Sequence, residues 1–149
     1  MRLYLDNCCY NRPYDTQSQV RIKLETEAKL HVQDLIRNKK VELATSYALL
    51  YENSKNPYSS RREAIKSFIN NYSTVYASPD QHDPIASKAR QIMNTGVKYK
   101  DALHVSAAIF LECDYFLTTD DRLLRYETDE IMIRNPIDYI RETEAESDG

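Results

Sequence analysis

The sequence has no apolar run long enough to cross a bilayer and no framework of paired cysteines. A membrane-spanning helix needs about 20 consecutive apolar residues. The three cysteines (Cys8, Cys9 and Cys113) are odd in number and include no CxxC pair, which argues against disulfides and against a structural zinc site. Met1 leads directly into a strand-like segment instead of a signal peptide, so we expect a cytoplasmic protein with no membrane contact.

Glycine is nearly absent, with two residues in 149, so the turns must rely on Pro, Asn, Asp and Ser. An excess of positive charge, which many nucleic-acid binders show, is also missing. The net charge of −3 is carried by the acidic segment 141–149, and residues 1–140 are close to neutral. The length fits one hydrophobic core. We predict one domain over residues 1–140 and a frayed, solvated acidic tail over residues 141–149.

Strand-like and helix-like segments alternate along the chain, which predicts an α/β fold with a central, mainly parallel five-stranded sheet and helices on both faces. Strands are predicted at residues 2–5, 41–45, 74–77, 115–118 and 131–133. The main helices are predicted at residues 17–38, 46–56, 60–72, 84–95 and 101–113. The first of these has its apolar face at Leu24, Ala28, Val32 and Leu35.

Several helix ends carry their own signals. Ser46 is a predicted N-cap, and residues 60–63 (Ser-Arg-Arg-Glu) have the capping-box pattern. Asp83-Pro84 predicts an N-cap followed by a first-turn proline, and Gly96 a C-cap.

Acidic residues follow the predicted strands, where ligands bind in open parallel sheets. Asp6 comes directly after the first strand, and Asp120 comes directly after the fourth. Each could instead form an Asx turn or cap a helix. Asp121 follows Asp120, and because one helix needs one cap, one of these two acids is left over for another role.

Two further acids lie on helices. Glu52 shares the apolar-leaning face of Ala48 and Leu49, where a carboxylate needs compensation, although a slightly rotated helix would leave it at the surface. Asp101 opens the most hydrophobic helix and could merely complement the helix dipole. His104 lies one turn later and is interpreted as a buried hydrogen-bond partner.

The first, second and fourth strands of a parallel sheet can bring these carboxylates to one edge. Clustered acids raise one another's pKa, and a hard divalent cation with oxygen ligands removes that penalty. The sequence therefore favours a Mg²⁺ or Mn²⁺ site with four candidate metal-binding and catalytic acids: Asp6, Glu52, Asp101 and Asp120.

Four stretches contain these acids: residues 3–7 (LYLDN), 45–52 (TSYALLYE), 100–108 (KDALHVSAA) and 116–120 (FLTTD). They resemble the PIN-domain family, which includes the VapC-like toxin ribonucleases. The resemblance covers about residues 2–138, and its most specific part is Asp-Ala-Leu-His at residues 101–104.

The resemblance implies a three-layer α/β/α PIN-like fold and endoribonuclease activity that needs Mg²⁺ or Mn²⁺. Many bacterial members of the family are toxins held inactive by a protein antitoxin, and many form homodimers. Asn7 and Thr118 are the expected supporting residues around the acids. Cys8 departs from the family, which usually has Ser or Thr at that position, and Asp121 adds an acid that we expect to face solvent.

An RNA substrate would need cations near the acidic site. Arg12, Lys100 and Arg122 are the favoured phosphate contacts. Other nearby cations are Lys55, Arg61, Arg62, Lys98 and Arg125. Tyrosines near the motifs could stack on unpaired bases, although they more often fill a core or a dimer contact.

Two rival functions remain open at this point. A receiver-like phosphoacceptor would use Asp80 after the third strand, but Arg134 stands where such a protein would carry Lys. A PIN-like module that binds RNA or protein without cutting would have no need to keep all four acids.

Overall fold

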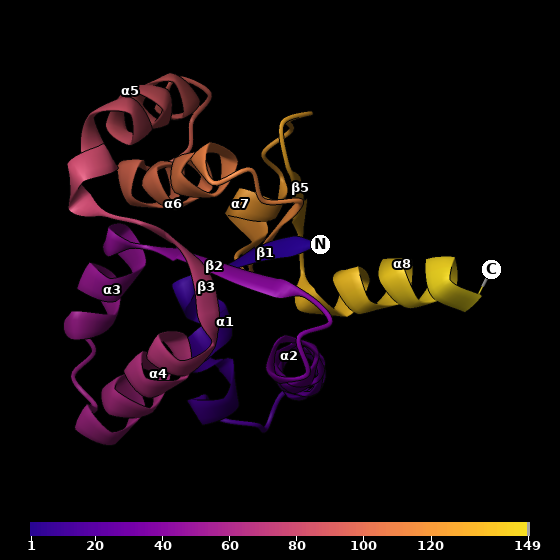
Figure 1. The fold of residues 1–149 in the computed structure, drawn as a ribbon. Coiled ribbons are helices and arrows are strands. Elements are labelled where there is room, and N and C mark those ends of the chain that lie inside the picture. Colours follow the sequence, from indigo (N-terminus) through magenta and orange to yellow (C-terminus); the bar gives the residue numbers. More distant parts are fainter. Residues whose placement is uncertain (149) are drawn as a thin grey trace.

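The structure is a computed structural model, which describes residues 1–148 and the side chains of residues 1–145. Its centre is one sheet of five parallel strands in the order β3-β2-β1-β4-β5 (Figure 1). The strands are β1 (Arg2–Leu5), β2 (Glu42–Ser46), β3 (Ser73–Ala77), β4 (Tyr115–Leu117) and β5 (Met132–Arg134). The predicted α/β fold with five strands is confirmed, and all of the strand pairs are parallel.

Helices cover both faces of the sheet and give three layers (Figure 1). One face packs on α5 (His82–Met93) and α6 (Tyr99–Phe110), and Tyr4 and Phe116 belong to its core. The helices on the other side of the sheet are α1 (Asn7–Asn11), α2 (Val20–Arg37), α3 (Tyr47–Ser54), α4 (Ser59–Tyr72) and α8 (Pro136–Asp148). Short turns η1 (Arg12–Tyr14) and η2 (Pro79–Gln81) and the helix α7 (Asp121–Leu124) complete the chain.

Strand β1 lies in the middle of the sheet, and its side chains point alternately to the two hydrophobic cores. Tyr4 faces the α5–α6 core, whereas Leu3 and Leu5 face the opposite one, as the two-residue repeat of a strand requires. Both faces of the interior strands β1 and β4 are covered, which accounts for their continuously apolar stretches, residues 3–5 and 115–117. At the carboxyl end, the Asp6 amide donates to the Leu117 carbonyl (2.9 Å), so β1 and β4 end side by side.

The predicted apolar face of α2 is wrong in register. Leu24 is 48% exposed, whereas Glu25 and Lys29 are buried on the face that meets the domain. Val32 is buried as expected. Hydrophobic periodicity misplaced this face because two of its buried positions carry charged side chains, and Glu25 is compensated by Arg12 and Asn135, which lie outside the helix.

The helix-end signals were confirmed in part. Ser46 caps α3, accepting from the Leu49 amide (3.4 Å). The capping box at residues 60–63 is wrong, because α4 begins at Ser59. A capping box instead occurs on η2, between Ser78 and Gln81. The predicted N-cap at Asp83 is also wrong, because α5 begins at His82 and Asp83 lies in its first turn.

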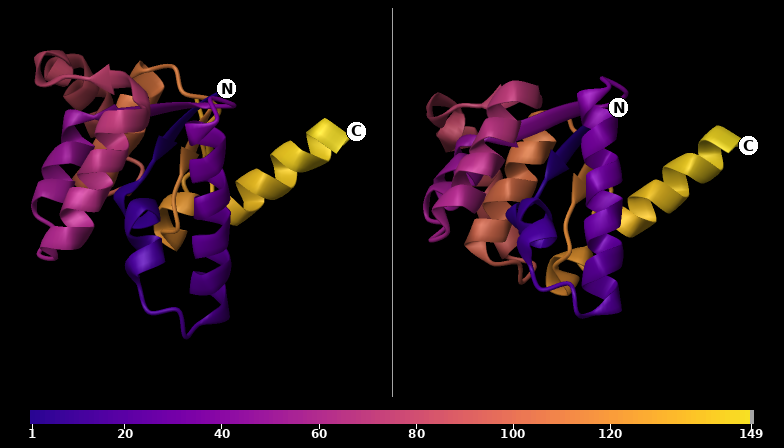
Figure 2. Two further views of the ribbon diagram at one scale, coloured as in Figure 1. Left: turned by 60° about the horizontal axis from the view of Figure 1, so that its bottom comes forward. Right: turned by 90° about the horizontal axis from the view of Figure 1, so that it is seen from below.

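The last helix extends from the body of the domain (Figure 2). The acidic segment 141–149, predicted as a frayed tail, is helical as far as Asp148, and Gly149 lies outside the described residues. Buried Tyr139 anchors the helix, and the Arg134–Glu142 pair (2.7 Å) fastens its middle. No helix in the described chain combines the length and apolar character that crossing a membrane requires.

The strand order argues against the receiver-like alternative. Receiver-like sheets have the order 2-1-3-4-5, which places the third strand next to the first. Here β3 is an edge strand, separated from β1 by β2, and Asp80 is exposed on η2. Asp80 is therefore two strands away from Asp6 and outside any acidic cluster built around β1.

Candidate functional site

Asp6 leaves β1 at the centre of the sheet and is held from several sides. It is 6% exposed. One carboxylate oxygen accepts from the Asn7 amide (2.8 Å), so Asp6 also caps α1. The other oxygen accepts from the Thr118 hydroxyl (2.8 Å) and from the Cys8 thiol (3.4 Å). These donors fix the orientation of a carboxylate that burial alone would disfavour.

Thr118 connects the acids that follow β1 and β4. Its hydroxyl donates to Asp6 and accepts from the Asp120 amide (3.1 Å). The Cys8 sulfur contacts Asp6 and Thr118 and accepts from the Thr119 amide (3.3 Å). A thiol is a weak hydrogen-bond partner, so Cys8 supports Asp6 less firmly than the Thr118 hydroxyl does.

Asp120 has the helix-capping role that its position allowed. Its carboxylate accepts from the Arg122 amide (2.9 Å) at the start of α7. Asp121 is the acid left over, and it faces away from the cluster, where Arg21 donates to both of its oxygens (2.7 and 2.9 Å). Asp121 is exposed, as expected, but it is ion-paired with Arg21.

Glu52 ends a chain of hydrogen bonds that begins on the sheet. Ser46 contacts the Tyr4 hydroxyl (2.7 Å), which contacts His104 Nδ1 (2.8 Å). His104 Nε2 meets one oxygen of Glu52 (2.7 Å). His104 is 1% exposed, so the interpretation of this residue as a buried hydrogen-bond partner is confirmed.

Lys100 and the side-chain amide of Asn7 contact the other Glu52 oxygen. Lys100 Nζ lies 2.9 Å from it, and Asn7 donates to it at 3.2 Å. Burial acts to raise the pKa of Glu52, but the contacts with His104 and Lys100 outweigh burial and lower it. Glu52 is therefore held as a carboxylate facing the same edge of the sheet as Asp6.

Asp101 differs from the other three acids in its surroundings. It lies in the first turn of α6, and no hydrogen bond or ion pair to its carboxylate occurs among the residues that the structure describes. Burial raises the pKa of Asp101, and the nearby charges of Asp6 and Asp120 raise it further. Acids from the ends of two strands and from the first turn of α6 thus act on one another electrostatically.

The donor set at this edge suits a hard divalent cation, because it consists of carboxylates whose repulsion a cation would relieve. In the arrangement that the structure describes, no three His, Cys, Asp or Glu side chains among residues 1–145 are close enough together to hold a metal ion. Lys100 and His104 instead supply the charge and hydrogen bonds that Glu52 needs. Metal binding would therefore require the acids to move closer together.

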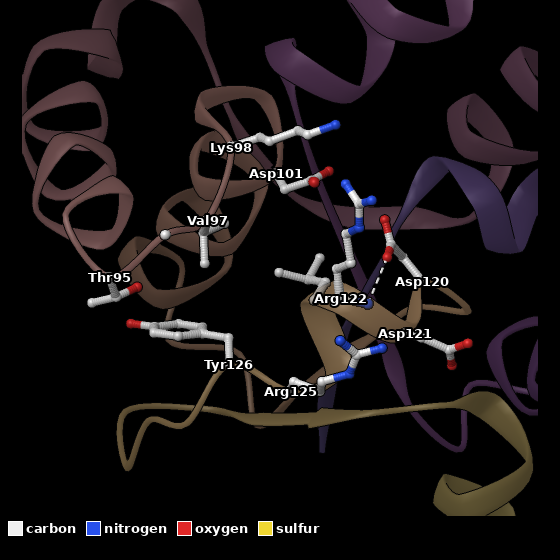
Figure 3. A pocket seen from close by; sticks show the side chains of 11 residues that line it. Thr95, Val97, Lys98, Asp101, Asp120, Asp121, Arg122, Arg125 and Tyr126 are labelled. Carbon is white, nitrogen blue, oxygen red and sulfur yellow. Dashed lines mark hydrogen bonds between the residues drawn. The ribbon is translucent and has the colours of Figure 1, made fainter.

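A cavity of about 660 Å³ opens beside Asp101 and Asp120, within the range of small-molecule sites. Figure 3 shows these two carboxylates facing the opening, with Asp121 turned away on the other side of α7. The rest of the lining includes three cations and one aromatic ring: Lys98, Arg122, Arg125 and Tyr126. Tyr126 was not among the sequence candidates, although it directly follows Arg125.

A second cavity, of about 400 Å³, lies on the other side of Glu52 between α3 and α6. Its lining is mainly apolar and aromatic, with two lysines: Tyr47, Ala48, Tyr51, Glu52, Lys55, Tyr99, Lys100, Leu103 and His104. Glu52 and Lys100 therefore separate this groove from the acidic edge.

Arg12 does not face the acidic edge. Its guanidinium pairs with Glu25 (2.8 Å) and Asp15 (2.9 Å), and Glu25 is fully buried. The prediction of a phosphate contact at Arg12 is thus not supported by its orientation. Lys100 and Arg122 do border the cluster, on its two sides.

Arg21 is a residue of the site that the sequence analysis missed. It pairs with Asp121 and donates to the Thr119 carbonyl (3.2 Å), so α2 holds the loop that carries Asp120. Arg21 also pairs with Glu25 (3.1 Å), four residues later. The i, i+4 spacing of Arg21 and Glu25 is visible in the sequence. The partners of Arg21 near β4, Thr119 and Asp121, are about 100 residues away from it and give no such local signal.

Comparisons with known proteins bear on the fold. No family model matches the sequence, and no curated protein matches it. Among solved structures, the chain is similar to one described as "Crystal structure of VapBC2 from Rickettsia felis bound to a DNA fragment from their promoter". The identity is 14%, the TM-score is 0.54, and the match covers 91% of this chain and 98% of the other. The likeness supports a PIN-like three-layer α/β fold for this chain.

Proposed function

We propose that this protein is a metal-dependent endoribonuclease that hydrolyses RNA phosphodiester bonds. The observation that carries the proposal is the placement of three acids beside one another. Asp101 and Asp120 line one cavity, and Thr118 joins Asp6 to the backbone of Asp120. The charges of Asp6 and Asp120 also raise the pKa of Asp101. Carboxylates are seldom placed close together without a ligand between them, because each raises the pKa of the others.

Asp6, Asp101 and Asp120 would hold Mg²⁺ or Mn²⁺, and Glu52 would bind it directly or through water. Such an ion, when bound, lowers the pKa of a water molecule and stabilises charge on the attacking and leaving oxygens. The protein's own contribution is orientation. Thr118 fixes Asp6, and His104 and Lys100 fix Glu52.

The substrate would approach through the cavity beside Asp120. Lys98, Arg122 and Arg125 line it and can pair with phosphates, which RNA presents at every nucleotide. Tyr126 adds a ring on which an unpaired base could stack. An aromatic ring beside basic side chains favours single-stranded RNA over a duplex, whose bases are already stacked.

We further propose that the protein is the toxin of a toxin–antitoxin pair. The similar structure is described as VapBC2 bound to a DNA fragment from their promoter. Here the groove between α3 and α6 suits an antitoxin segment that buries apolar side chains on Tyr51 and Leu103 and places an acid near Lys55 and Lys100. A segment bound there would contact Glu52 and block the acidic edge.

The test is cleavage of a single-stranded RNA in the presence of Mn²⁺. Asp101→Asn removes one carboxylate at nearly constant shape, and we expect activity to fall by about 100-fold or more, as for loss of a catalytic electrostatic group. Asp80→Asn is the matched control, since Asp80 is an exposed acid on η2, and it should cleave like the wild type.

The same assay separates the nuclease from the rival, a non-catalytic PIN-like module. A binding module would retain RNA without cutting it in the wild type. Equal cleavage by the wild type and by Asp101→Asn would show a contaminating nuclease or a different active site, and would refute the proposed function.

A further inference from the structure

A small cavity unconnected with the acidic edge lies between α1, α2 and α4. Its volume is about 170 Å³. Three polar side chains of α2 line it at intervals of four residues, Lys29, Gln33 and Arg37, so they share one face of the helix. Tyr10 and Phe68 form much of the opposite wall. The cavity has no place in the proposed nuclease.

Lys29 is a buried cation without a counter-ion. It is 6% exposed, and its ammonium lies 5.6 Å from the ring centres of Tyr10 and of Phe68. Within the described part of the chain, no Asp or Glu forms an ion pair with it. The Cys9 thiol is near, but burial raises its pKa well above the usual value, so it stays neutral.

Residues that line the cavity also have hydrogen-bond donors without acceptors. The ammonium of Lys29 has three, and the structure pairs it with one side-chain acceptor, Gln33 (2.5 Å). The buried hydroxyl of Tyr10 has no partner among the described residues. Arg37 adds a second positive charge at the rim, where Asp34 pairs with it on the exposed side of α2 (3.3 Å). Unsatisfied buried donors and unpaired positive charge are costly unless an acceptor fills the space.

We propose that this cavity binds a small oxyanion, of the size and charge of phosphate or sulfate, between Lys29, Arg37 and the hydroxyl of Tyr10. Such an ion would supply the missing counter-charge and accept hydrogen bonds from the Lys29 ammonium and the Tyr10 hydroxyl. The volume is below the range of about 300–1,000 Å³ typical of sites for larger organic ligands. A free ion therefore fits, and a whole nucleotide does not.

The test measures thermal unfolding in EDTA at pH 7, with increasing inorganic phosphate and NaCl adjusted to constant ionic strength. The wild type should show a saturable rise in Tm. Lys29→Met keeps the side chain's length and removes its charge, and its Kd for phosphate should be at least about tenfold weaker. Lys23→Met, at an exposed position of the same helix, should bind like the wild type.

Two further variants locate the ion. Tyr10→Phe keeps Lys29 and the ring, and its Kd should weaken about threefold to tenfold from the loss of one hydrogen bond. The double variant Arg122→Met, Arg125→Met removes cations beside Asp120 and should leave phosphate binding unchanged. AMP tests the alternative source of the phosphate group, a nucleotide, and should bind far more weakly than free phosphate.

The proposal is overturned if the wild type gains no more stability from phosphate than from NaCl, or if Lys29→Met or Tyr10→Phe retains the full effect. Loss of the effect in the Arg122–Arg125 double variant, or an equal effect of AMP, would place the anion beside Asp120 and would also overturn it.

Discussion

Asp101 is the residue at which the cost of the acidic cluster is most visible. Asp6, Asp120 and Glu52 each accept hydrogen bonds from the protein, whereas the described residues offer Asp101 no donor. Its pKa is raised by burial and by the charges of Asp6 and Asp120. A carboxylate kept under these conditions is one that a bound cation would stabilise.

Lys29 carries a comparable cost on the far side of the sheet. Burial lowers the pKa of Lys29 from 10.5 to about 8. In the folded protein the proton is lost near pH 8, and in the unfolded chain near pH 10.5. Between these values the unfolded state binds more protons, so stability rises with pH through this window, and below pH 8 the full cost of the buried charge remains.

We therefore predict that Lys29→Met is more stable than the wild type at pH 7, and that the difference shrinks between pH 8 and pH 10.5. The change across that window should be on the order of 3 kcal/mol, from the size of the pKa shift. Urea unfolding of both proteins in phosphate-free buffer measures it. A difference that stays constant with pH would show that Lys29 is not a buried charge.

At the scale of elements, Glu25 ties three parts of the chain to α2. Its buried carboxylate pairs with Arg12 of η1 and Arg21 of α2, and accepts from Asn135 at the junction of β5 and α8 (2.5 Å). Arg21 in turn holds Asp121, next to Asp120. One carboxylate thus connects the loop after α1, the start of α8 and the loop that carries a site acid.

Removing the charge of Glu25 should loosen this connection. We expect Glu25→Gln to lower the free energy of unfolding by about 2 kcal/mol. That is less than the roughly 3–5 kcal/mol typical of a fully buried pair, because Arg12 and Arg21 are 21% and 48% exposed. Chemical denaturation at pH 7 measures the loss. Glu27→Gln, at an exposed position of the same helix, should change stability by less than about 0.5 kcal/mol, and equal effects of the two variants would contradict the account.

The same elements show what the sequence could and could not predict. The apolar strands and the Ser46 cap depend on local patterns, and the structure confirms them. The buried face of α2 depends on Arg12 and Asn135 meeting Glu25, and no periodicity within the helix encodes those partners. The orientation of Arg12 was missed for the same reason. The sequence does not show that Glu25 is the acid with which Arg12 pairs.

At the scale of the molecule, a near-neutral domain gathers acids at one edge and cations around them. The strand order places β1 between β2 and β4, so residues that follow three strands and open α6 converge although they are up to 114 positions apart. Strand–helix alternation predicted the parallel sheet, but it did not predict the order of the strands. The cavity beside Asp120 was not predictable either, because its lining comes from the loop before α6 and from α7 and the residues after it.

The most direct test compares the thermal stability of the wild type and Asp101→Asn in EDTA and in millimolar Mn²⁺. Without metal, Asp101→Asn should melt higher, because it removes a like charge. With Mn²⁺, the wild type should gain about 2–3 kcal/mol if the ion is near 100 times its Kd, while Asp101→Asn gains little and the order of the two reverses. Asp80→Asn should follow the wild type throughout. Equal gains in the wild type and Asp101→Asn, or no gain in the wild type, would contradict a shared metal site.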